Sequence, residues 1–249
     1  MSPAPGPADL AALGPYFAVD QHPAGAGASS PWRKFEELVT EPDAVRARAG
    51  AVRHALATMG GMADEAIEPR VAASVAHLGI TSRLVSPALA VAAGSGIVLD
   101  LAPGDTWWQP VPGGPMPVSI RMPQPEATPD PAGALAERVL DGPVRALVDA
   151  FARLSVSRRI LWGNVASALH GAATMLDRER PEWTSRTRAL TAALRGREPL
   201  AGTGEVDSHG RFRRHSCCLI YRAAPGGAGP VCGDCVLAAP PRAPERQAP

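Results

Sequence analysis

One stretch decides how the C-terminal region must fold: Ser216-Cys217-Cys218-Leu219-Ile220-Tyr221-Arg222, followed after a Gly/Pro-rich turn by Cys232-Gly233-Asp234-Cys235. The chain has 249 residues and four cysteines, and all four lie in this stretch. A protein that uses cysteine as a small core residue scatters it among its helices. We therefore expect a C-terminal subdomain, residues 196–249, whose fold is organised around thiols that lie close together.

Three chemistries require four close thiols: disulfides, a structural zinc ion and a [2Fe–2S] cluster. Disulfides do not persist in a reducing cytoplasm, and the adjacent Cys217 and Cys218 would bridge only with strain. Cys232 and Cys235 form a good zinc half-site, but an adjacent pair departs from the two-to-four-residue spacing of zinc sites. A [2Fe–2S] cluster takes two thiolates at each iron, so its ligand pairs need not converge on one point. The residues favour the cluster and leave zinc as the alternative.

The neighbouring residues fit a cluster as well. Glycines allow close backbone approach, and their N–H groups are candidate donors to sulfur: Gly226, Gly227, Gly229 and Gly233. Positive charge would raise a cluster's reduction potential or, as the alternative, only form a solvated basic face: Arg211, Arg213, Arg214, His215 and Arg222. His215 precedes Cys217 by two residues. It is either a hydrogen-bond partner of the cluster or an ordinary loop residue.

The cysteine stretch also carries a resemblance. Cys-Cys-Leu-Ile-Tyr-Arg at 217–222, followed by Cys-Gly-Asp-Cys-Val-Leu at 232–237, resembles the C-terminal signature of the FhuF-like ferric siderophore reductases. The run Arg159-Ile160-Leu161-Trp162-Gly163-Asn164 is similar to that family with less specificity. Thirteen residues separate Cys218 from Cys232, where the family pattern has about ten, and the extra residues fall in a turn that tolerates insertion.

The resemblance implies a [2Fe–2S] cofactor held by Cys217, Cys218, Cys232 and Cys235. It further implies one-electron reduction of a ferric siderophore in the cytoplasm, with release of Fe(II). Outer-sphere electron transfer needs no acid or nucleophile, so we assign no catalytic side chain. Candidates for steering an anionic chelate or an acidic donor are Arg213, Arg214 and Arg222.

The electrons must come from a separate donor. Gly94-Ser95-Gly96 is the nearest candidate for a nucleotide loop, but it lacks the third glycine and precedes a predicted strand. We therefore expect an external ferredoxin or flavoprotein reductase. Trp107, Trp108 and Trp162 suit a siderophore site, although core packing is the stronger explanation for them.

Composition and the chain ends indicate the compartment. The 25 Lys+Arg balance 24 Asp+Glu, which leaves no field to attract nucleic acid. Met1–Phe17 has neither a basic nor a long apolar segment of a signal peptide. The uncharged run Leu84–Leu99 is interrupted by Pro87 and by glycine, so it predicts a buried helix and a strand rather than a membrane span. We expect a cytoplasmic protein, with peripheral membrane association left open.

Periodicity predicts a mainly α fold with a small β insertion (α+β). Residues 1–31 are rich in Pro, Ala, Gly and Ser and predict a flexible segment with a short helix near 9–19. A mainly helical domain, 32–195, should follow, with short strands near 96–122 (at 96–101, 106–109 and 118–122) and a proline-rich linker at 122–131. Helices are expected over 43–59, 68–78, 82–93, 144–154, 158–176 and 184–195.

Two other functions compete with the reductase. One is a structural zinc module that binds a partner, and the other is a [2Fe–2S] electron carrier or redox sensor without a siderophore substrate. A relative that matures or assembles siderophores is a further alternative.

Overall fold

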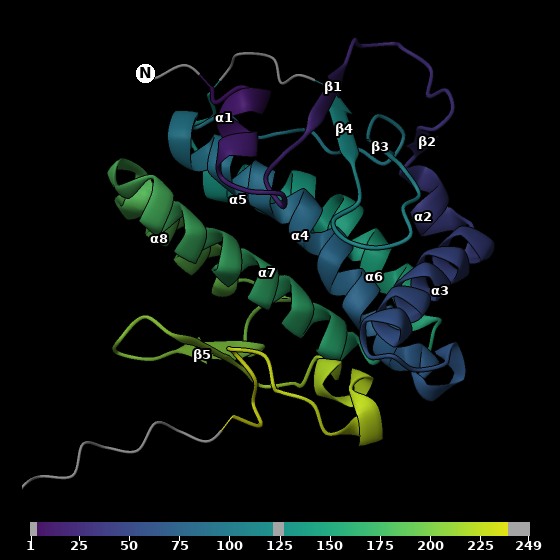
Figure 1. The fold of residues 1–249 in the computed structure, drawn as a ribbon. Coiled ribbons are helices and arrows are strands. Elements are labelled where there is room, and N and C mark those ends of the chain that lie inside the picture. The colour runs from purple at the N-terminus through teal and green to yellow at the C-terminus, as the bar shows by residue number, and fades with distance from the viewer. Residues whose placement is uncertain (1–3, 122–126, 239–249) are drawn as a thin grey trace, which may run out of the picture.

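Two long helices, α4 (Pro69–Ser95) and α7 (Arg158–Glu179), pack along each other at the centre of the protein (Figure 1). The computed structural model describes residues 4–121 and 127–238. α3 (Pro42–Met59) packs on α4, and α8 (Thr184–Arg195) packs on both central helices. The described residues are mostly helical with small sheets, which confirms the predicted mainly α fold with a small β insertion.

α4 is the core helix of the fold. The sequence predicts two helices here, but one continuous helix of 27 residues forms, because Ile80 and Leu84 are fully buried across the expected break. Gly96 ends the helix with φ +78°, a conformation that glycine adopts without steric cost. α4 is long and apolar enough to cross a membrane, yet 78% of its apolar window is buried inside the protein. Core helices of soluble proteins meet the same criterion.

The ends of the remaining helices follow local sequence signals. Ser157 accepts a hydrogen bond from the Ile160 N–H at 3.3 Å and caps α7, as predicted. α5 (Pro131–Leu135) continues through a wide π-helical segment, Ala136–Val144, into α6 (Arg145–Ala152). The shorter helices are α1 (Pro7–Ala12) and α2 (Glu36–Thr40).

A four-stranded sheet in the order β1-β4-β3-β2 lies on one side of the central helices (Figure 1). Its strands are β1 (Asp20–His22), β2 (Arg33–Lys34), β3 (Trp107–Trp108) and β4 (Val118–Arg121). β1 pairs with β4 in parallel, and the other pairs are antiparallel. The strands predicted near 106–109 and 118–122 are present, whereas 96–101 is buried loop.

The N-terminal segment 1–31, predicted to be flexible apart from a short helix near 9–19, packs on the core over part of its described residues, 4–31. Leu10, Phe17 and Val19 are buried in the main core, and β1 adds a strand to the sheet. Burial of these apolar side chains outweighs the disordering composition of the segment around them. Of the predicted linker, residues 122–126 lie outside the described residues, and Pro131 begins α5.

A short hairpin leads from α8 to the cysteines. β5 (Gly204–Val206) and β6 (Phe212–Arg214) pair antiparallel, and a Cβ at Gly204 would lie 2.5 Å from the Phe212 ring. Only glycine therefore permits this close approach. The predicted division into domain 32–195 and subdomain 196–249 stays a prediction.

Candidate metal centre

The cysteine segment lies across α4 and α7, on the side opposite the four-stranded sheet (Figure 1). Polar contacts attach it to both helices. Ser74 Oγ on α4 donates to the Cys218 carbonyl at 2.9 Å. Ser167 Oγ on α7 donates to the carboxylate of Asp234, between the two later cysteines. The Arg214 N–H donates to the Asp234 carbonyl at 2.9 Å and thereby joins β6 to the same turn.

The thiols lie as two pairs, and each pair joins one of the adjacent cysteines to one of the C-x-x-C cysteines. Cys217 Sγ is 4.0 Å from Cys235 Sγ, and Cys218 Sγ is 3.5 Å from Cys232 Sγ. Among the residues that the structure describes, no three His, Cys, Asp or Glu side chains gather so that they could hold one metal ion. Because zinc needs four ligands around one point and a two-iron cluster needs two thiolates per iron, the arrangement fits the cluster better.

The backbone turn after the adjacent cysteines places an N–H group against one of their sulfurs. Leu219 has φ +71°, which is rare for a residue with a side chain and costs free energy. This turn directs the Leu219 N–H to Cys217 Sγ at 3.3 Å. A second backbone donor, the Leu237 N–H, lies 3.4 Å from Cys235 Sγ. Both N–H groups would stabilise thiolates that ligate a metal.

The glycines serve a different purpose from the one predicted. In the described chain no glycine N–H donates to a cysteine sulfur. Instead, the glycines shape the loop between Cys218 and Cys232. Gly226 and Gly227 have φ of +71° and +68°. A Cβ at Gly229 would lie 2.6 Å from Ala224 Cβ and 2.9 Å from the Tyr221 carbonyl oxygen. The longer Cys218–Cys232 spacing is thus accommodated in a compact turn.

Apolar side chains next to the cysteines anchor the segment on the helices. Leu219, Ile220 and Ala223 pack in a small cluster separate from the main core. Their partners come from α3, α4 and the connection between them: Leu56, Ala57, Met62, Ile67, Val71 and Ala72. Burial of this cluster holds Cys217 and Cys218 against the start of α4.

Burial and sulfur contacts shift the pKa values of the thiols. The hydrogen bond between Cys218 and Cys232 lowers the pKa of Cys218 and raises that of Cys232. The Ile220 N–H and the charge of Arg214 also lower the pKa of Cys218. Burial raises the pKa of Cys217. Cys218 is therefore the thiol of its pair that ionises first. A thiol must lose its proton to ligate a metal.

The predicted steering role is wrong for Arg214. Its side chain is fully buried, with 0% exposure, so it cannot contact an approaching molecule. A charged side chain is rarely enclosed in this way, because burial removes its hydration, and sequence alone gives no sign of it here.

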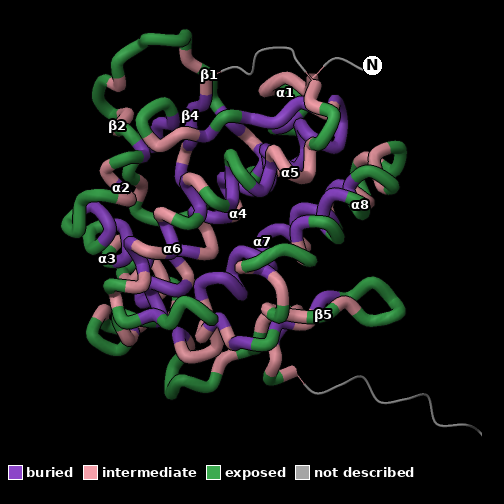
Figure 2. Tube along the Cα trace, turned by 180° about the vertical axis from the view of Figure 1, so that it is seen from behind, coloured by how far each residue is buried: buried purple, intermediate pink, exposed green. Residues whose placement is uncertain are grey.

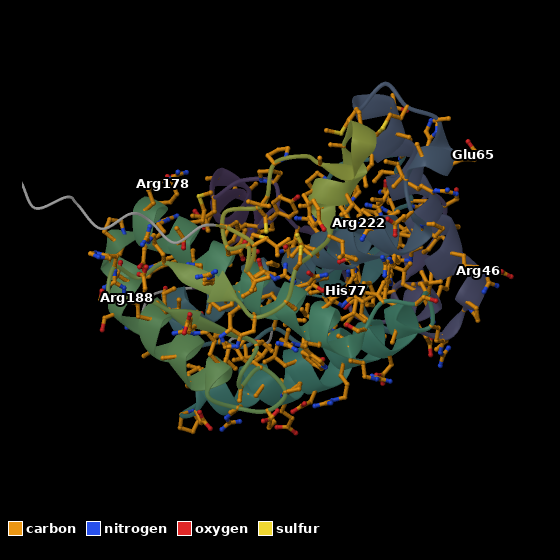
Figure 3. All side chains as sticks on the ribbon, turned by 90° about the horizontal axis from the view of Figure 1, so that it is seen from below. Arg46, Glu65, His77, Arg178, Arg188 and Arg222 are labelled. Atoms are coloured by element: carbon orange, nitrogen blue, oxygen red, sulfur yellow. The ribbon has the colours of Figure 1, made fainter. Side chains whose placement is uncertain are left out.

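Arg213 and Arg222 lie nearer the surface. Arg213 Nη2 donates to the Val236 carbonyl at 2.9 Å, which ties the guanidinium to the backbone beyond the last cysteine. Arg222, labelled in Figure 3, forms an ion pair with Glu68 and is partly exposed. For these two arginines, steering stays a prediction.

The other aromatic and histidine candidates lie in ordinary structural positions. His215 Nδ1 contacts the Gly202 carbonyl at 2.8 Å, which supports its interpretation as a loop residue. Trp107 is buried and stacks on His22 with 3.7 Å between ring centroids. Trp108 and Trp162 belong to the main core. Core packing therefore explains all three tryptophans.

Sequence reasoning missed the side chains that position the centre: Ser74, Asn164, Ser167 and Asp234. Asn164 Nδ2 donates to the Ser74 carbonyl at 3.0 Å and lies 3.2 Å from its hydroxyl, and Ser74 in turn donates to Cys218. The available signal was the placement of small polar residues within otherwise apolar helices, which is unfavourable unless they find partners.

A groove of about 480 Å³ runs between α3, α4 and α7 beside the centre. Its walls are mainly apolar or small side chains, including Val52, Leu56, Gly171 and Met175. Two of its lining residues also contact the cysteine segment or its anchors: Leu56 packs with the apolar cluster, and Ser167 binds Asp234.

Comparison with known families adds one match. Residues 214–237 match the FhuF 2Fe-2S C-terminal domain, and this segment contains all four cysteines. A comparison with curated proteins gave no match. Together with the two sulfur pairs, the match confirms the predicted [2Fe–2S] cofactor and disfavours the zinc alternative. The assignment of the four cysteines as its ligands stays a prediction.

Proposed function

We propose that the protein is a ferric siderophore reductase, because its residues 214–237 match the FhuF 2Fe-2S C-terminal domain. When bound, a [2Fe–2S] cluster supplies one-electron transfer. The substrate is Fe(III) in a siderophore, whose hard oxygen donors hold Fe(III) more tightly than Fe(II), so reduction labilises the iron. We also propose that the protein works in the cytoplasm and receives electrons from a separate ferredoxin or flavoprotein reductase.

The exposure of the cysteines carries this proposal. Cys218 and Cys235 are buried, with 1% exposure each, whereas Cys217 and Cys232 are half-buried. Each sulfur pair therefore has one enclosed and one partly exposed thiol. This arrangement supports electron exchange with a molecule docked at the surface, because part of each sulfur pair is accessible without unfolding.

The groove between α3, α4 and α7 is the docking place that we propose for the chelate. Its mainly apolar walls suit the bulk of an organic chelator, and Arg48 in its lining adds positive charge. The Ser167–Asp234 contact links one wall to the turn that holds Cys235. A chelate in the groove would therefore lie beside the cysteine segment. Arg222, on the exposed side of that segment, is proposed to attract an anionic chelate or an acidic donor.

The direct test uses protein purified without oxygen. Visible and EPR spectra are recorded before and after dithionite, and a ferric trihydroxamate siderophore is then added to the reduced protein. The reductase proposal expects rapid reoxidation and release of Fe(II), measured with a ferrous-specific chelator. A reduced protein that ignores the chelate would overturn it and leave an electron carrier or sensor.

A variant pair tests the docking place. A Cβ at Gly171 meets nothing within 4 Å, so Gly171→Phe should fill the groove without disturbing the helix. We expect the KM for the chelate to rise about tenfold, or about 1.4 kcal/mol, while the visible spectrum is unchanged. Gly50→Phe is the matched control, because Gly50 is also an open helical glycine but lies outside the groove. Equal KM values in the two variants would exclude this docking place.

A further inference from the structure

Arg214 is the largest of the fully buried side chains in the described protein. It has no ion-pair partner among residues 4–121 and 127–238. A buried charge without a counter-charge is strongly unfavourable, because burial removes its hydration and nothing replaces it. The position of Arg214 therefore indicates that an anionic group is expected near it.

Hydrogen bonds and close packing fix the position of the Arg214 guanidinium. Arg214 Nη2 donates to Asn164 Oδ1 at 2.6 Å and to the Ile160 carbonyl at 3.3 Å. A Cβ at Gly163 would lie 3.0 Å from the same Nη2 and 2.3 Å from Ser216 Oγ. Only glycine at this point of α7 lets Arg214 and Ser216 pack so closely. Ile160, Gly163 and Asn164 of α7 thus form a cradle for Arg214.

Two donors of Arg214 have no partner. Nε and Nη1 are buried and make no hydrogen bond within the described residues. His77, labelled in Figure 3, is the nearby titratable group on α4, and it is fully buried. Burial, followed by the charge of Arg214, lowers the pKa of His77 to about 3, so His77 is neutral and adds no second positive charge beside the guanidinium.

The same network leads from Arg214 to a cysteine. Asn164, which accepts from Arg214, donates to Ser74, and Ser74 donates to the Cys218 carbonyl. The backbone N–H of Arg214 also donates to the carbonyl of Asp234, the residue before Cys235, at 2.9 Å. Arg214 thus lies on the helix-facing side of the centre, where water does not screen its charge.

We propose that Arg214 is a positioning residue that supplies the buried counter-charge of the cysteine centre and raises its reduction potential. Four thiolates bring negative charge to this site, and reduction by one electron adds one further negative charge. A fixed guanidinium in a low-dielectric surrounding stabilises the more negative, reduced state more than the oxidised state. The inference rests on the cluster-binding part of the proposed function and does not depend on the siderophore.

The test compares reduction potentials of purified, cluster-loaded variants without any chelate. Arg214→Gln removes the charge, and Arg214→Lys retains it. We expect Arg214→Gln to lower the equilibrium constant for reduction at least tenfold, which is 59 mV for one electron, with Arg214→Lys closer to the wild type. Arg211→Gln is the matched control, because Arg211 is exposed on the same hairpin and paired with Asp207.

A second variant tests the proposal if the Arg214 variants fail to fold or to load the cluster. Asn164→Asp keeps Arg214 and places a carboxylate against its guanidinium, so it should also lower the potential. A potential in Arg214→Gln equal to that of Arg211→Gln would overturn the proposal. If Arg214→Gln and Arg214→Lys both fail to load the cluster, a wild-type potential in Asn164→Asp overturns it, and a lowered one supports it. Failure to reduce a siderophore leaves these potentials unchanged and tests only the reductase proposal.

Discussion

The four-stranded sheet and the cysteine segment lie on opposite sides of the central helices, and both consist of short pieces of chain (Figures 1 and 2). The sheet is closed by buried apolar and aromatic side chains, among them Phe17, Trp108 and Ile120. The cysteine segment has only 3₁₀ turns in its described part, 215–238. It is attached through serine, asparagine and arginine contacts and one small apolar cluster.

The difference shows two ways to stabilise short segments. The sheet gains its free energy from burial of apolar surface, which needs no ligand. The cysteine segment encloses thiols and a guanidinium whose burial is unfavourable until a cofactor binds. Because a group that binds only the folded state stabilises it, cofactor binding should contribute strongly to the order of this side of the molecule.

The largest expected effect comes from removing a ligand. Cys218→Ser should abolish the visible spectrum of the cluster, because oxygen replaces the more enclosed thiolate of its pair. Helix content by circular dichroism should stay near the wild-type value, since the sheet and the helices do not depend on the cofactor. Ser216→Ala, two residues away, is the control and should stay coloured. A Cys218→Ser protein with full cluster content would refute the ligand assignment.

Trp108→Ala should lower the stability of the protein without changing the cluster. Trp108 is buried, and its Nε1 donates to the Lys34 carbonyl at 3.1 Å. Loss of a buried tryptophan costs about 3–5 kcal/mol of unfolding free energy, measured by urea titration. The absorption spectrum of the folded protein should be unchanged, because the sheet lies far from the cysteines. A spectral change in the folded state would show that the two regions are coupled.

Cluster-free protein can be used to test which sulfurs lie next to each other. Mild oxidation of cluster-free protein should cross-link Cys218 with Cys232 and Cys217 with Cys235, because these sulfurs lie 3.5 Å and 4.0 Å apart. We expect these two links to exceed all others several-fold in peptide mapping by mass spectrometry. A dominant Cys232–Cys235 link would mean that the pairing depends on the cofactor.

The smallest effect is expected for Ser167→Ala. The variant removes one hydrogen bond to Asp234, which is worth about 1 kcal/mol. Amide hydrogen exchange should accelerate in residues 232–237, while exchange in β1 and β4 is unaffected. Thr174→Ala, farther along α7 and exposed, is the control. Faster exchange in the sheet as well would indicate a global loss of stability rather than local release of the cysteine segment.

The amino-acid sequence by itself determined the chemistry of the centre and much of the helical order. Four cysteines confined to one stretch favoured a [2Fe–2S] cluster and left zinc as the alternative, because an adjacent pair suits two irons better than one metal ion. Ser157 and the periodic apolar residues after it located α7, since capping and helical periodicity are local properties.

Only the tertiary structure decided which groups meet. Nothing in the sequence spacing pairs Cys217 with Cys235, and composition placed Arg214 at the surface and residues 4–31 outside the core. These outcomes depend on packing between segments that are separate in the sequence, as where Ser74 meets Cys218. The free energy of such contacts comes from shared burial and shared hydrogen bonds, which no single segment contains.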